Sequence, residues 1–343
     1  MLMHQAVYQG ARTISLSQAE ALTPGPGQVR IDVAYTGICG TDLHIYHGDM
    51  DARVGIPAVI GHEMAGRVSA LGEGVEGVTI GDPVTVRPLD WCGECPACLA
   101  GHPHICHRLV FIGIDAPGAM QQSWIVPARS LVPLPHDLPL DRAALVEPTA
   151  VAVHDVRRAE VAAGEKVLVV GGGPVGMLIA LVAKHGGAEV LVTEPDPFRR
   201  QFAAGLGLST LDPSTEDVAA RIERWTDGAG VPVAFEVSGA AAGVDTAVAA
   251  LGVRGRLCLV AIHPRPREVN LHRFFWRELH LVGARLYTHE DFVDAVRLVA
   301  DGIVPAGQFI TLVEPLARTA AAFEALESGS GQMKILIDCR TPQ

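Results

Sequence analysis

The sequence of 343 residues lacks several features that mark particular classes of protein. It has no run of eighteen or more apolar residues, so no segment has the length of a transmembrane helix. It has no block of lysine and arginine, and its net charge is -11. Both facts argue against a nucleic-acid or anionic-membrane partner, because such partners favour a basic face. With 49% hydrophobic residues, the chain is expected to form a large core divided between two domains.

The chain also lacks the signals of export. Its N-terminal stretch, MLMHQAVYQGAR, does not show the basic-then-apolar layout of a signal peptide. Seven cysteines, an odd number in a long chain, fit metal ligation better than a framework of disulfides. The sequence therefore predicts a cytoplasmic protein. Cys258 lies in an apolar run and Cys339 near the C-terminus, so both are expected to be inert thiols.

The stretch from Tyr35 to Gly66 gathers side chains that bind metals and move protons. These side chains are Cys39, Thr41, Asp42, His44, His62 and Glu63. Thiolate, imidazole and carboxylate groups are the usual ligands of zinc. Cys39 and His62 are far apart in the chain, so only the fold can bring them to one ion. Taken singly, each has a simpler interpretation, as a buried free cysteine and a core histidine.

A second group of cysteines lies in the segment WCGECPACLAGHPHIC. Cys92, Cys95 and Cys98 are three residues apart, and Cys106 follows eight residues later. Four thiolates at this spacing can surround a tetrahedral ion with no open position, as in a structural zinc site. The alternatives are a redox CxxC pair or disulfides, which the absence of an export signal disfavours. We therefore expect a structural zinc lobe over about residues 90–108.

The first part of the chain has the pattern of a β domain. Val29, Ile31 and Val33 are apolar at every second residue, which is typical of a half-buried strand. Glycine and proline separate this strand from the short apolar runs that follow it. Short strands joined by tight turns predict a barrel-like β domain.

Glu147 interrupts a mostly apolar helical stretch. A carboxylate is costly to bury unless it meets a proton, a cation or a metal, so Glu147 is a candidate for a metal site. Pro148 can equally mark the start of a helix, with Glu147 as a solvated charge at its N-terminus. The sequence leaves both interpretations open.

From residue 166 onward, strands and helices alternate. The apolar strand KVLVV precedes a GxGxxG motif and an apolar helix, and the next strand ends on Glu194, eighteen residues after Gly176. Glycines permit a tight turn and the close approach of a pyrophosphate to the helix N-terminus, while the acid accepts the ribose hydroxyls. This order predicts a dinucleotide-binding domain with a doubly wound parallel sheet. Its cofactor contacts are expected from Gly171, Gly173, Pro174, Val175 and Gly176.

The choice of cofactor depends on the residues after the second strand. Glu194 would repel a 2′-phosphate, which favours NAD over NADP. Arg199 and Arg200 follow closely and could hold a phosphate, with Arg199 as the cofactor contact. Their place in an amphipathic helix favours a solvent-facing role instead. The loops after two later strands are expected to face the nicotinamide half, and they carry Ser238, Gly239, Ile262 and His263.

The motifs GICGTDLH, GHEMAG, the cysteine lobe, EPTAVAVH and VVGGGPVG follow one another in the order of the zinc-dependent medium-chain dehydrogenases. The chain resembles the sorbitol or polyol dehydrogenase branch of this alcohol dehydrogenase superfamily over its whole length. The resemblance implies an α/β protein with a GroES-like β-barrel catalytic domain over residues 1–147 and a Rossmann NAD-binding domain over 148–284. Residues 285–343 would return to complete the catalytic domain. A homodimer or homotetramer is also implied.

The resemblance assigns roles to the metal-binding side chains. Cys39 and His62 would bind a catalytic zinc ion, and Asp42 would fix the tautomer of the histidine. Typical alcohol dehydrogenases have a second cysteine where this chain has Glu147. Glu63 and Glu147 therefore remain alternatives for the carboxylate ligand, and the chain is expected to hold two zinc ions, one catalytic and one structural.

The resemblance also implies a reaction, the NAD-dependent oxidation of a secondary alcohol of a polyol, sugar acid or cyclitol to a ketone. Zinc would bind the substrate hydroxyl and lower its pKa to give an alkoxide, and hydride would pass to NAD. Thr41 would accept the proton and pass it through the nicotinamide ribose to His44. A threonine or butanediol-type small alcohol is an alternative substrate. A nucleotide-binding regulatory protein without catalysis is an alternative of another class. The predicted substrate-pocket residues are Tyr46, Gln121, Arg285 and Tyr287.

Overall fold

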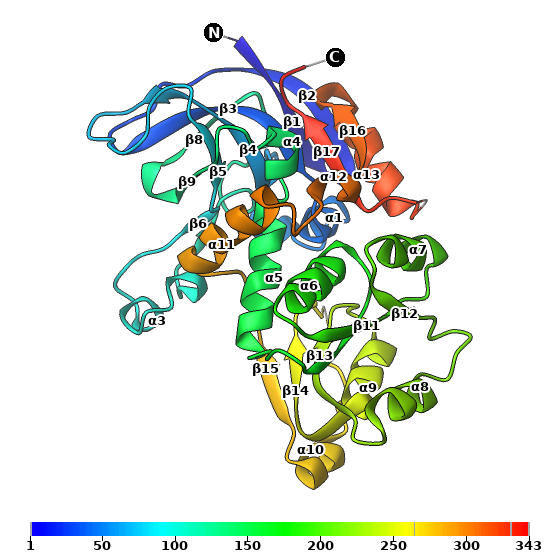
Figure 1. Ribbon diagram of the computed structural model, residues 1–343. Helices are drawn as coiled ribbons and strands as arrows, with labels where there is room; N and C mark the ends of the chain where they lie inside the picture. The colour runs from blue at the N-terminus through cyan, green and yellow to red at the C-terminus, as the bar shows by residue number, and fades with distance from the viewer. Residues whose placement is uncertain (1, 264, 330, 342–343) are drawn as a thin grey trace. The chain divides into compact units, whose positions relative to one another are not determined.

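The computed structural model describes residues 2–263, 265–329 and 331–341. The chain forms two compact units, drawn in Figure 1. Unit 1 comprises Met1–Glu147 and Thr288–Gln343, and unit 2 comprises Pro148–Tyr287. The units divide at 147/148 and 287/288, and the resemblance implies domain boundaries at 147/148 and 284/285. Within the described ranges, no helix combines the length and the apolar character needed to cross a membrane.

Unit 1 is built on a seven-stranded sheet that joins the two ends of the chain. Its order is β16 (Ile310–Pro315), β17 (Lys334–Asp338), β3 (Gln28–Gly37), β4 (Glu63–Leu71), β5 (Pro83–Val86) and β9 (Leu131–Pro133), with β8 (Ser123–Pro127) paired to β3. The blue strand β3 of the N-terminal part and the orange and red strands β16 and β17 of the C-terminal part belong to this one sheet (Figure 1). The C-terminal strands β16 and β17 are therefore part of the β domain.

The other elements of unit 1 are two small antiparallel strand pairs and several helices. A hairpin of β1 (Leu2–Gly10) and β2 (Thr13–Glu20) stands apart from the main sheet, and β6 (Leu89–Asp90) pairs with β7 (Val110–Phe111) beside the cysteine lobe. The α-helices are α1 (Gly40–Tyr46), α2 (Asp51–Val54), α3 (Pro96–Leu99), α4 (Leu140–Ala143), α11 (His289–Ala300), α12 (Ala306–Phe309) and α13 (Thr319–Glu327). The alternation expected of Val29, Ile31 and Val33 is found in β3, where all three side chains are buried.

Unit 2 is a six-stranded parallel sheet. Its order is β12 (Ser209–Leu211), β11 (Glu189–Thr193), β10 (Lys166–Val170), β13 (Val231–Glu236), β14 (Leu251–Leu259) and β15 (His280–Gly283). The chain starts at β10, moves outward to β12, and then returns to place β13 on the other side of β10. The direction of winding thus reverses between β10 and β13, which is where sheets of this kind bind ligands.

Helices cover both faces of this parallel sheet. The helices are α6 (Pro174–His185), α7 (Pro197–Gly205), α8 (Val218–Thr226), α9 (Ala241–Ala250) and α10 (Leu271–Arg277), and α5 (Val146–Arg158) crosses the boundary between the units. Leu168 of β10 shares a buried cluster with Val244 of α9. Val169 points to the opposite face. There, a Cβ on Gly176 of α6 would lie 3.5 Å from Cγ1 of Val169. The predicted doubly wound arrangement follows from this alternation.

Arg273 of α10 closes the C-terminal end of α9. Its Nε donates a hydrogen bond to the carbonyl oxygen of Val248 at 2.9 Å, and its Nη2 donates to those of Ala249 and Leu251. The last carbonyl groups of a helix have no partner within the helix and carry partial negative charge. One guanidinium therefore binds two carbonyl groups at the end of α9 and one at the start of β14, and it attaches α10 to both elements.

Replacing Arg273 with alanine is expected to lower the free energy of unfolding by about 1–2 kcal/mol, because the three carbonyl groups lose a charged donor. Denaturant unfolding measures the effect. Arg277→Ala, in the same helix and without such contacts among the described residues, is the matched control and should change stability by less than about 0.5 kcal/mol. Equal midpoints for the two variants would contradict the prediction.

Candidate functional site

The predicted metal ligand Cys39 stands at the N-terminal cap of α1. Asp42, in the first turn, accepts the backbone N–H of Cys39 through Oδ2 at 2.9 Å and so caps the helix. The other oxygen, Oδ1, lies 3.6 Å from Nδ1 of His62. Asp42 is fully buried. One carboxylate therefore orients the segments that carry both predicted ligands, in the supporting role expected of it.

His62 is buried among acidic side chains. Burial alone would lower the pKa of its imidazole. The neighbouring Asp42, Cys39 and Glu147 outweigh this effect and hold the pKa of that ring well above its ordinary value. Two buried atoms of this group, Oδ1 of Asp42 and Nδ1 of His62, have no hydrogen-bond partner. An imidazole surrounded by three groups that can carry negative charge is an environment that favours a cation.

Glu63 is paired with Lys334, a residue that no sequence motif marks. Their side chains are 1% and 3% exposed. Nζ of Lys334 donates to Oε1 and Oε2 of Glu63 at 2.8 and 2.6 Å and to the carbonyl oxygen of Ile38 at 3.1 Å. Glu63 belongs to β4 and Lys334 to β17, so β3 lies between them. The residue of β3 paired with Glu63 is Gly37, where a Cβ would lie 2.3 Å from Oε2 of Glu63. The glycine leaves the space in which the two side chains meet.

Lys334 remains charged in this position. Burial lowers the pKa of an amine, but Glu63 and Cys39 outweigh it and raise the pKa of Lys334 above its usual value. A charged residue inside the apolar run MKILIDC is the one sequence signal that could have indicated it, because lone charges are costly in a buried strand.

Glu147 lies in the first turn of α5 and is 4% exposed. The interpretation of Glu147 as a solvated charge is therefore wrong, since this helix begins inside the protein. Its charge acts on both His62 and Lys334. Cys39 acts on the same two residues, so the four predicted ligands share one charged neighbourhood. Among the described residues, however, only the four cysteines of the lobe bring three or more ligand atoms within 4.8 Å of one another.

Thr41 and His44 both lie on α1, three residues apart. Thr41 is half-buried, and the side chain of His44 is 41% exposed, with Nδ1 at 3.2 Å from Oδ2 of Asp49. Residues at this spacing are neighbours on a helix. The proton relay through them stays a prediction.

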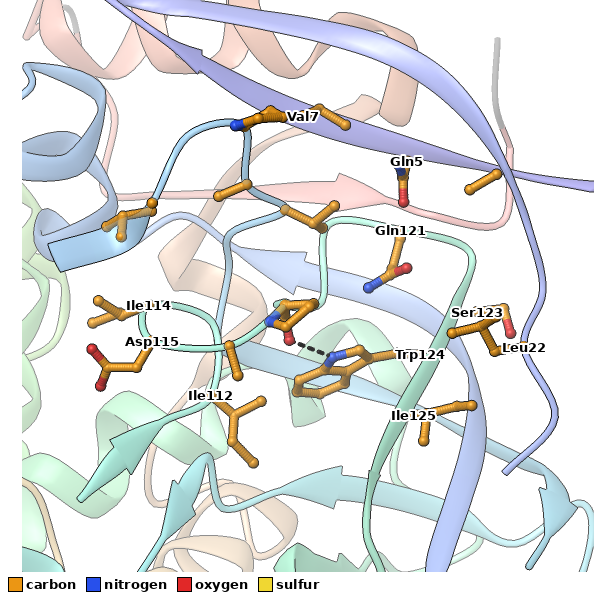
Figure 2. A pocket seen from close by; sticks show the side chains of 18 of the residues that line it. Gln5, Val7, Leu22, Ile112, Ile114, Asp115, Gln121, Ser123, Trp124 and Ile125 are labelled. Atoms are coloured by element: carbon orange, nitrogen blue, oxygen red, sulfur yellow. Dashed lines mark hydrogen bonds between the residues drawn. The ribbon is translucent and has the colours of Figure 1, made fainter. Parts of the chain in front are cut away.

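The four predicted substrate-pocket residues occupy different environments. Tyr46 is buried against Phe323, with ring centroids 5.1 Å apart. Gln121 lines a cavity of about 740 Å³ within unit 1, which Figure 2 shows together with Gln5 and Trp124. None of the predicted metal ligands lines that cavity. At the end of unit 2, Arg285 is exposed and Tyr287 is buried. Their role in substrate binding stays a prediction.

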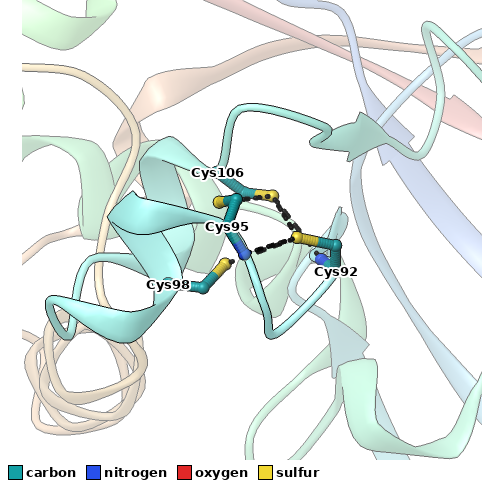
Figure 3. A group of neighbouring side chains, drawn as sticks. All are labelled: Cys92, Cys95, Cys98 and Cys106. Carbon is teal, nitrogen blue, oxygen red and sulfur yellow. Dashed lines mark hydrogen bonds between the residues drawn. The ribbon is translucent and has the colours of Figure 1, made fainter.

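The four cysteines of the lobe converge in unit 1 (Figure 3). Their sulfur atoms all lie within 4.8 Å of one another. Sγ of Cys106 is 3.4 Å from that of Cys92 and 3.7 Å from that of Cys95, and Sγ of Cys98 is 4.0 Å from that of Cys92. This is the closed arrangement of four sulfur donors that the spacing predicts.

Backbone N–H groups point at these sulfur atoms. Cys95 donates to Sγ of Cys92 at 3.4 Å, His107 donates to Sγ of Cys95 at 3.4 Å, and Arg108 donates to Sγ of Cys106 at 3.3 Å. Donors of this kind favour the thiolate form. The backbone N–H of Glu94 contributes most to lowering the pKa of Cys92 to about 6. Burial, in contrast, raises the pKa of Cys98 to about 12. The convergence of four sulfur atoms is what suits the lobe to hold a dication.

The glycine motif of unit 2 forms a tight turn at the end of β10. Gly171 has φ +107°, and a Cβ on it would lie 2.9 Å from the backbone nitrogen of Ser238. A Cβ on Gly176 would lie 2.0 Å from the carbonyl oxygen of Gly171. Both positions require glycine. Ser238 and Gly239 follow β13, and Ile262 follows β14, at the same edge of the sheet.

Glu194 is held against the glycine loop. Its Oε2 accepts the N–H of Gly172 at 2.7 Å, and its Oε1 accepts the N–H of Asp196 at 2.8 Å. Arg199 is 38% exposed, with Nη1 at 3.8 Å from Oε2 of Glu194. The sequence predicts that Arg200 faces solvent, and this prediction is wrong, because its side chain is only 22% exposed. It donates to the carbonyl oxygens of Glu194 and Pro195 and pairs with Asp212 at 2.9 Å, which joins α7 to the end of β12.

Two protein families and several relatives match the chain. Residues 25–136 match the alcohol dehydrogenase GroES-like domain, and residues 174–301 match the zinc-binding dehydrogenases. The chain is 50% identical to 2-dehydro-3-deoxy-L-galactonate 5-dehydrogenase of Pseudoalteromonas atlantica, over 99% of this chain and 100% of that protein. It is 33% identical to L-galactonate-5-dehydrogenase of Escherichia coli, over 94% of each chain.

Solved structures of related enzymes have the same fold as this chain. The crystal structure of 2R,3R-butanediol dehydrogenase from Bacillus subtilis superposes with a TM-score of 0.91, at 32% identity, over 98% of this chain and 99% of that one. The predicted fold, a GroES-like domain with a doubly wound parallel-sheet domain, is confirmed. With these motifs, this topology and these relatives, the chain belongs to the zinc-binding medium-chain dehydrogenases, a family of NAD(P)-dependent oxidoreductases.

Proposed function

We propose that this enzyme oxidises a secondary hydroxyl group of a sugar acid to a ketone, with NAD as the hydride acceptor. The observation that carries the proposal is the buried, negatively charged environment of His62 beside Cys39 and Glu147. The substrate class comes from the full-length likeness to a relative named for the 5-dehydrogenation of a sugar acid. Polyols and cyclitols are the neighbouring substrate classes, and threonine or a small diol is the alternative.

Two zinc ions per chain are proposed. The four cysteines of the lobe would hold the structural ion, and Cys39 and His62, with Glu63 or Glu147, would hold the catalytic one. The unpaired atoms Oδ1 of Asp42 and Nδ1 of His62 support this fit, because a ligand histidine commonly turns its other nitrogen to a carboxylate. A bound zinc ion lowers the pKa of a hydroxyl group that contacts it.

The chain's own residues prepare the site for proton transfer. Asp42 orients His62, and Lys334 offsets the charge of Glu63. Thr41 would accept the proton of the substrate hydroxyl and release its own toward His44, which is exposed and can exchange it with water. The hydride leaves the carbon atom that carries this hydroxyl group, so the products are a ketone, NADH and one proton.

NAD is proposed as the cofactor because a 2′-phosphate would meet the carboxylate of Glu194. We expect a higher kcat/KM with NAD than with NADP, and Glu194→Gln should reduce that preference by about tenfold or more, since the repulsion is removed and the acceptor for Gly172 is kept. Initial rates with both cofactors measure this. Arg199→Ala tests whether the nearby guanidinium contributes to NADP binding. If it does, this variant should bind NADP more weakly than the wild type. A wild-type preference for NADP would contradict the proposal.

A homo-oligomer formed through the edge of the parallel sheet is also proposed. β15 is the last strand of that sheet, and Leu281 on it is 52% exposed. In the preceding helix α10, Phe275 and Trp276 are 79% and 73% exposed. Open strand edges and large apolar side chains favour association with another chain. Light scattering that gives the 36.2 kDa of one chain would contradict this proposal.

The cytoplasm is proposed as the compartment, because all seven cysteines are free of disulfides.

A panel of substrates tests the proposed function. NADH formation is followed with 2-dehydro-3-deoxyaldonates, aldonates, polyols, threonine and small diols. The highest kcat/KM is expected with a sugar acid. A higher value with threonine or butanediol would establish the alternative substrate class. No turnover by protein that binds NAD and contains about two zinc ions per chain would establish the regulatory protein instead.

A further inference from the structure

A buried carboxylate in unit 2 lies outside the chemistry proposed above. Glu236 ends β13 and is fully buried. Its Oε1 accepts the N–H of Ser238 at 2.9 Å, the hydroxyl of Ser238 at 2.5 Å and the N–H of Gly239 at 3.0 Å. The hydroxyl oxygen of Ser238 also accepts the N–H of Ala240 at 3.1 Å. The turn after β13 is thus wrapped around Glu236, while Ser238 itself is exposed.

The other oxygen of Glu236 reaches a second loop. Oε2 lies 2.9 Å from Nε2 of His263, which follows β14. Nε of Arg267 donates to Nδ1 of His263 at 3.3 Å, and Nη2 of Arg267 donates to the carbonyl oxygen of Gly239 at 3.2 Å. Because Arg267 offers only donors, Nδ1 must accept, so the proton sits on Nε2 and the ring donates to Glu236. The four residues form a closed ring of hydrogen bonds.

This ring lies at the carboxyl ends of β13 and β14, beside the point where the winding of the sheet reverses. Glu194, the predicted contact of the adenosine ribose, directly follows β11 on the far side of β10. The turn at Ser238 packs against the glycine loop, since a Cβ on Gly171 would lie 2.9 Å from the Ser238 nitrogen. A dinucleotide that crosses this edge with its adenosine over β11 has its nicotinamide half over β13 and β14.

We propose that Glu236, His263 and Arg267 are positioning residues for the nicotinamide half of the bound dinucleotide. They hold the loops after β13 and β14 at a fixed spacing beside the cofactor. The hydroxyl of Ser238 donates to Glu236 and accepts from the N–H of Ala240, so these two contacts fix its orientation in the turn. This inference rests on the dinucleotide dependence of the proposed function, and it adds residues that no motif of the fingerprint contains.

The test compares two ligands that differ only in the nicotinamide. The Kd values of NADH and of ADP-ribose are measured by titration calorimetry for the wild type and for Arg267→Ala. We expect NADH binding to weaken by about tenfold and ADP-ribose binding to stay within about twofold. The matched control is Arg265→Ala. Arg265 is an exposed arginine of the same loop with no hydrogen bond among the described contacts, and both Kd values should stay unchanged.

Substitutions of Glu236 provide a graded second measurement. Glu236→Gln keeps an acceptor for the turn and should weaken NADH binding less than Glu236→Ala does, at similar ADP-ribose affinity. Parallel weakening of both ligands in Arg267→Ala would show a general effect on folding and would overturn the proposal, as would unchanged NADH binding. Failure of the wild-type enzyme to bind any nicotinamide dinucleotide would contradict the proposed function itself, so the two failures are distinguishable.

Discussion

Replacing Lys334 with methionine is expected to lower the free energy of unfolding by about 3–5 kcal/mol, because Glu63 would keep its charge in a buried site without a partner. Both side chains are almost completely buried, so water cannot substitute for the lost amine. The midpoint of urea unfolding measures the effect. Lys184→Met is the matched control, since Lys184 lies near the surface with one bond to the carbonyl of Gly207, and the loss there should be below about 1 kcal/mol.

A double variant separates the lost charge pair from lost packing. Adding Glu63→Gln to Lys334→Met removes the unpaired charge and should recover part of the stability, so the two substitutions should couple favourably. Purely additive losses would show that the pair does not explain the effect. Gly37→Ala offers an independent probe. A methyl group there would lie 2.3 Å from Oε2 of Glu63, and a loss of about 1–3 kcal/mol is expected.

Replacing Cys95 with serine is expected to reduce the zinc content from about two ions per chain to about one, because a closed four-sulfur site loses a ligand. Between residues 92 and 106 the lobe has little regular structure, α3 and a 3-10 turn at Pro103–Ile105, so the proposed ion would be its main support. Metal analysis measures the loss, and amide hydrogen exchange over residues 92–106 should become faster.

Cys258→Ala is the control for this experiment. Burial raises the pKa of the Cys258 thiol, and the residue lies in β14 of the other unit, so the zinc content should remain at about two. An unchanged zinc content in Cys95→Ser would contradict the structural site. A chelator gives a second test. The proposed catalytic site has an open position, so its zinc should be removed first, with activity lost before the lobe unfolds.

Local patterns in the sequence determined much of this protein. The strand KVLVV, the glycines after it and the acid at the end of the next strand are close in the chain and need no distant partner to be interpreted. The cysteine spacing determined the lobe in the same way. Two elements of unit 2 escaped prediction. β12 has only three residues, too few to show the alternation of apolar residues that marks a strand. In α10, which follows its cap Asn270, apolar residues repeat at helical spacing over only about one turn.

Only the tertiary structure shows which residues of distant strands come into contact. Glu63 meets Lys334 only because β4, β3 and β17 lie side by side with Gly37 between them, and the two residues are 271 positions apart. The ring of Glu236, His263 and Arg267 likewise depends on the adjacency of β13 and β14. The burial of Glu147 depends on where α5 begins in the fold. Periodicity and spacing report which face a residue shares with its neighbours in the chain, whereas the register between distant strands is set by the whole packed core.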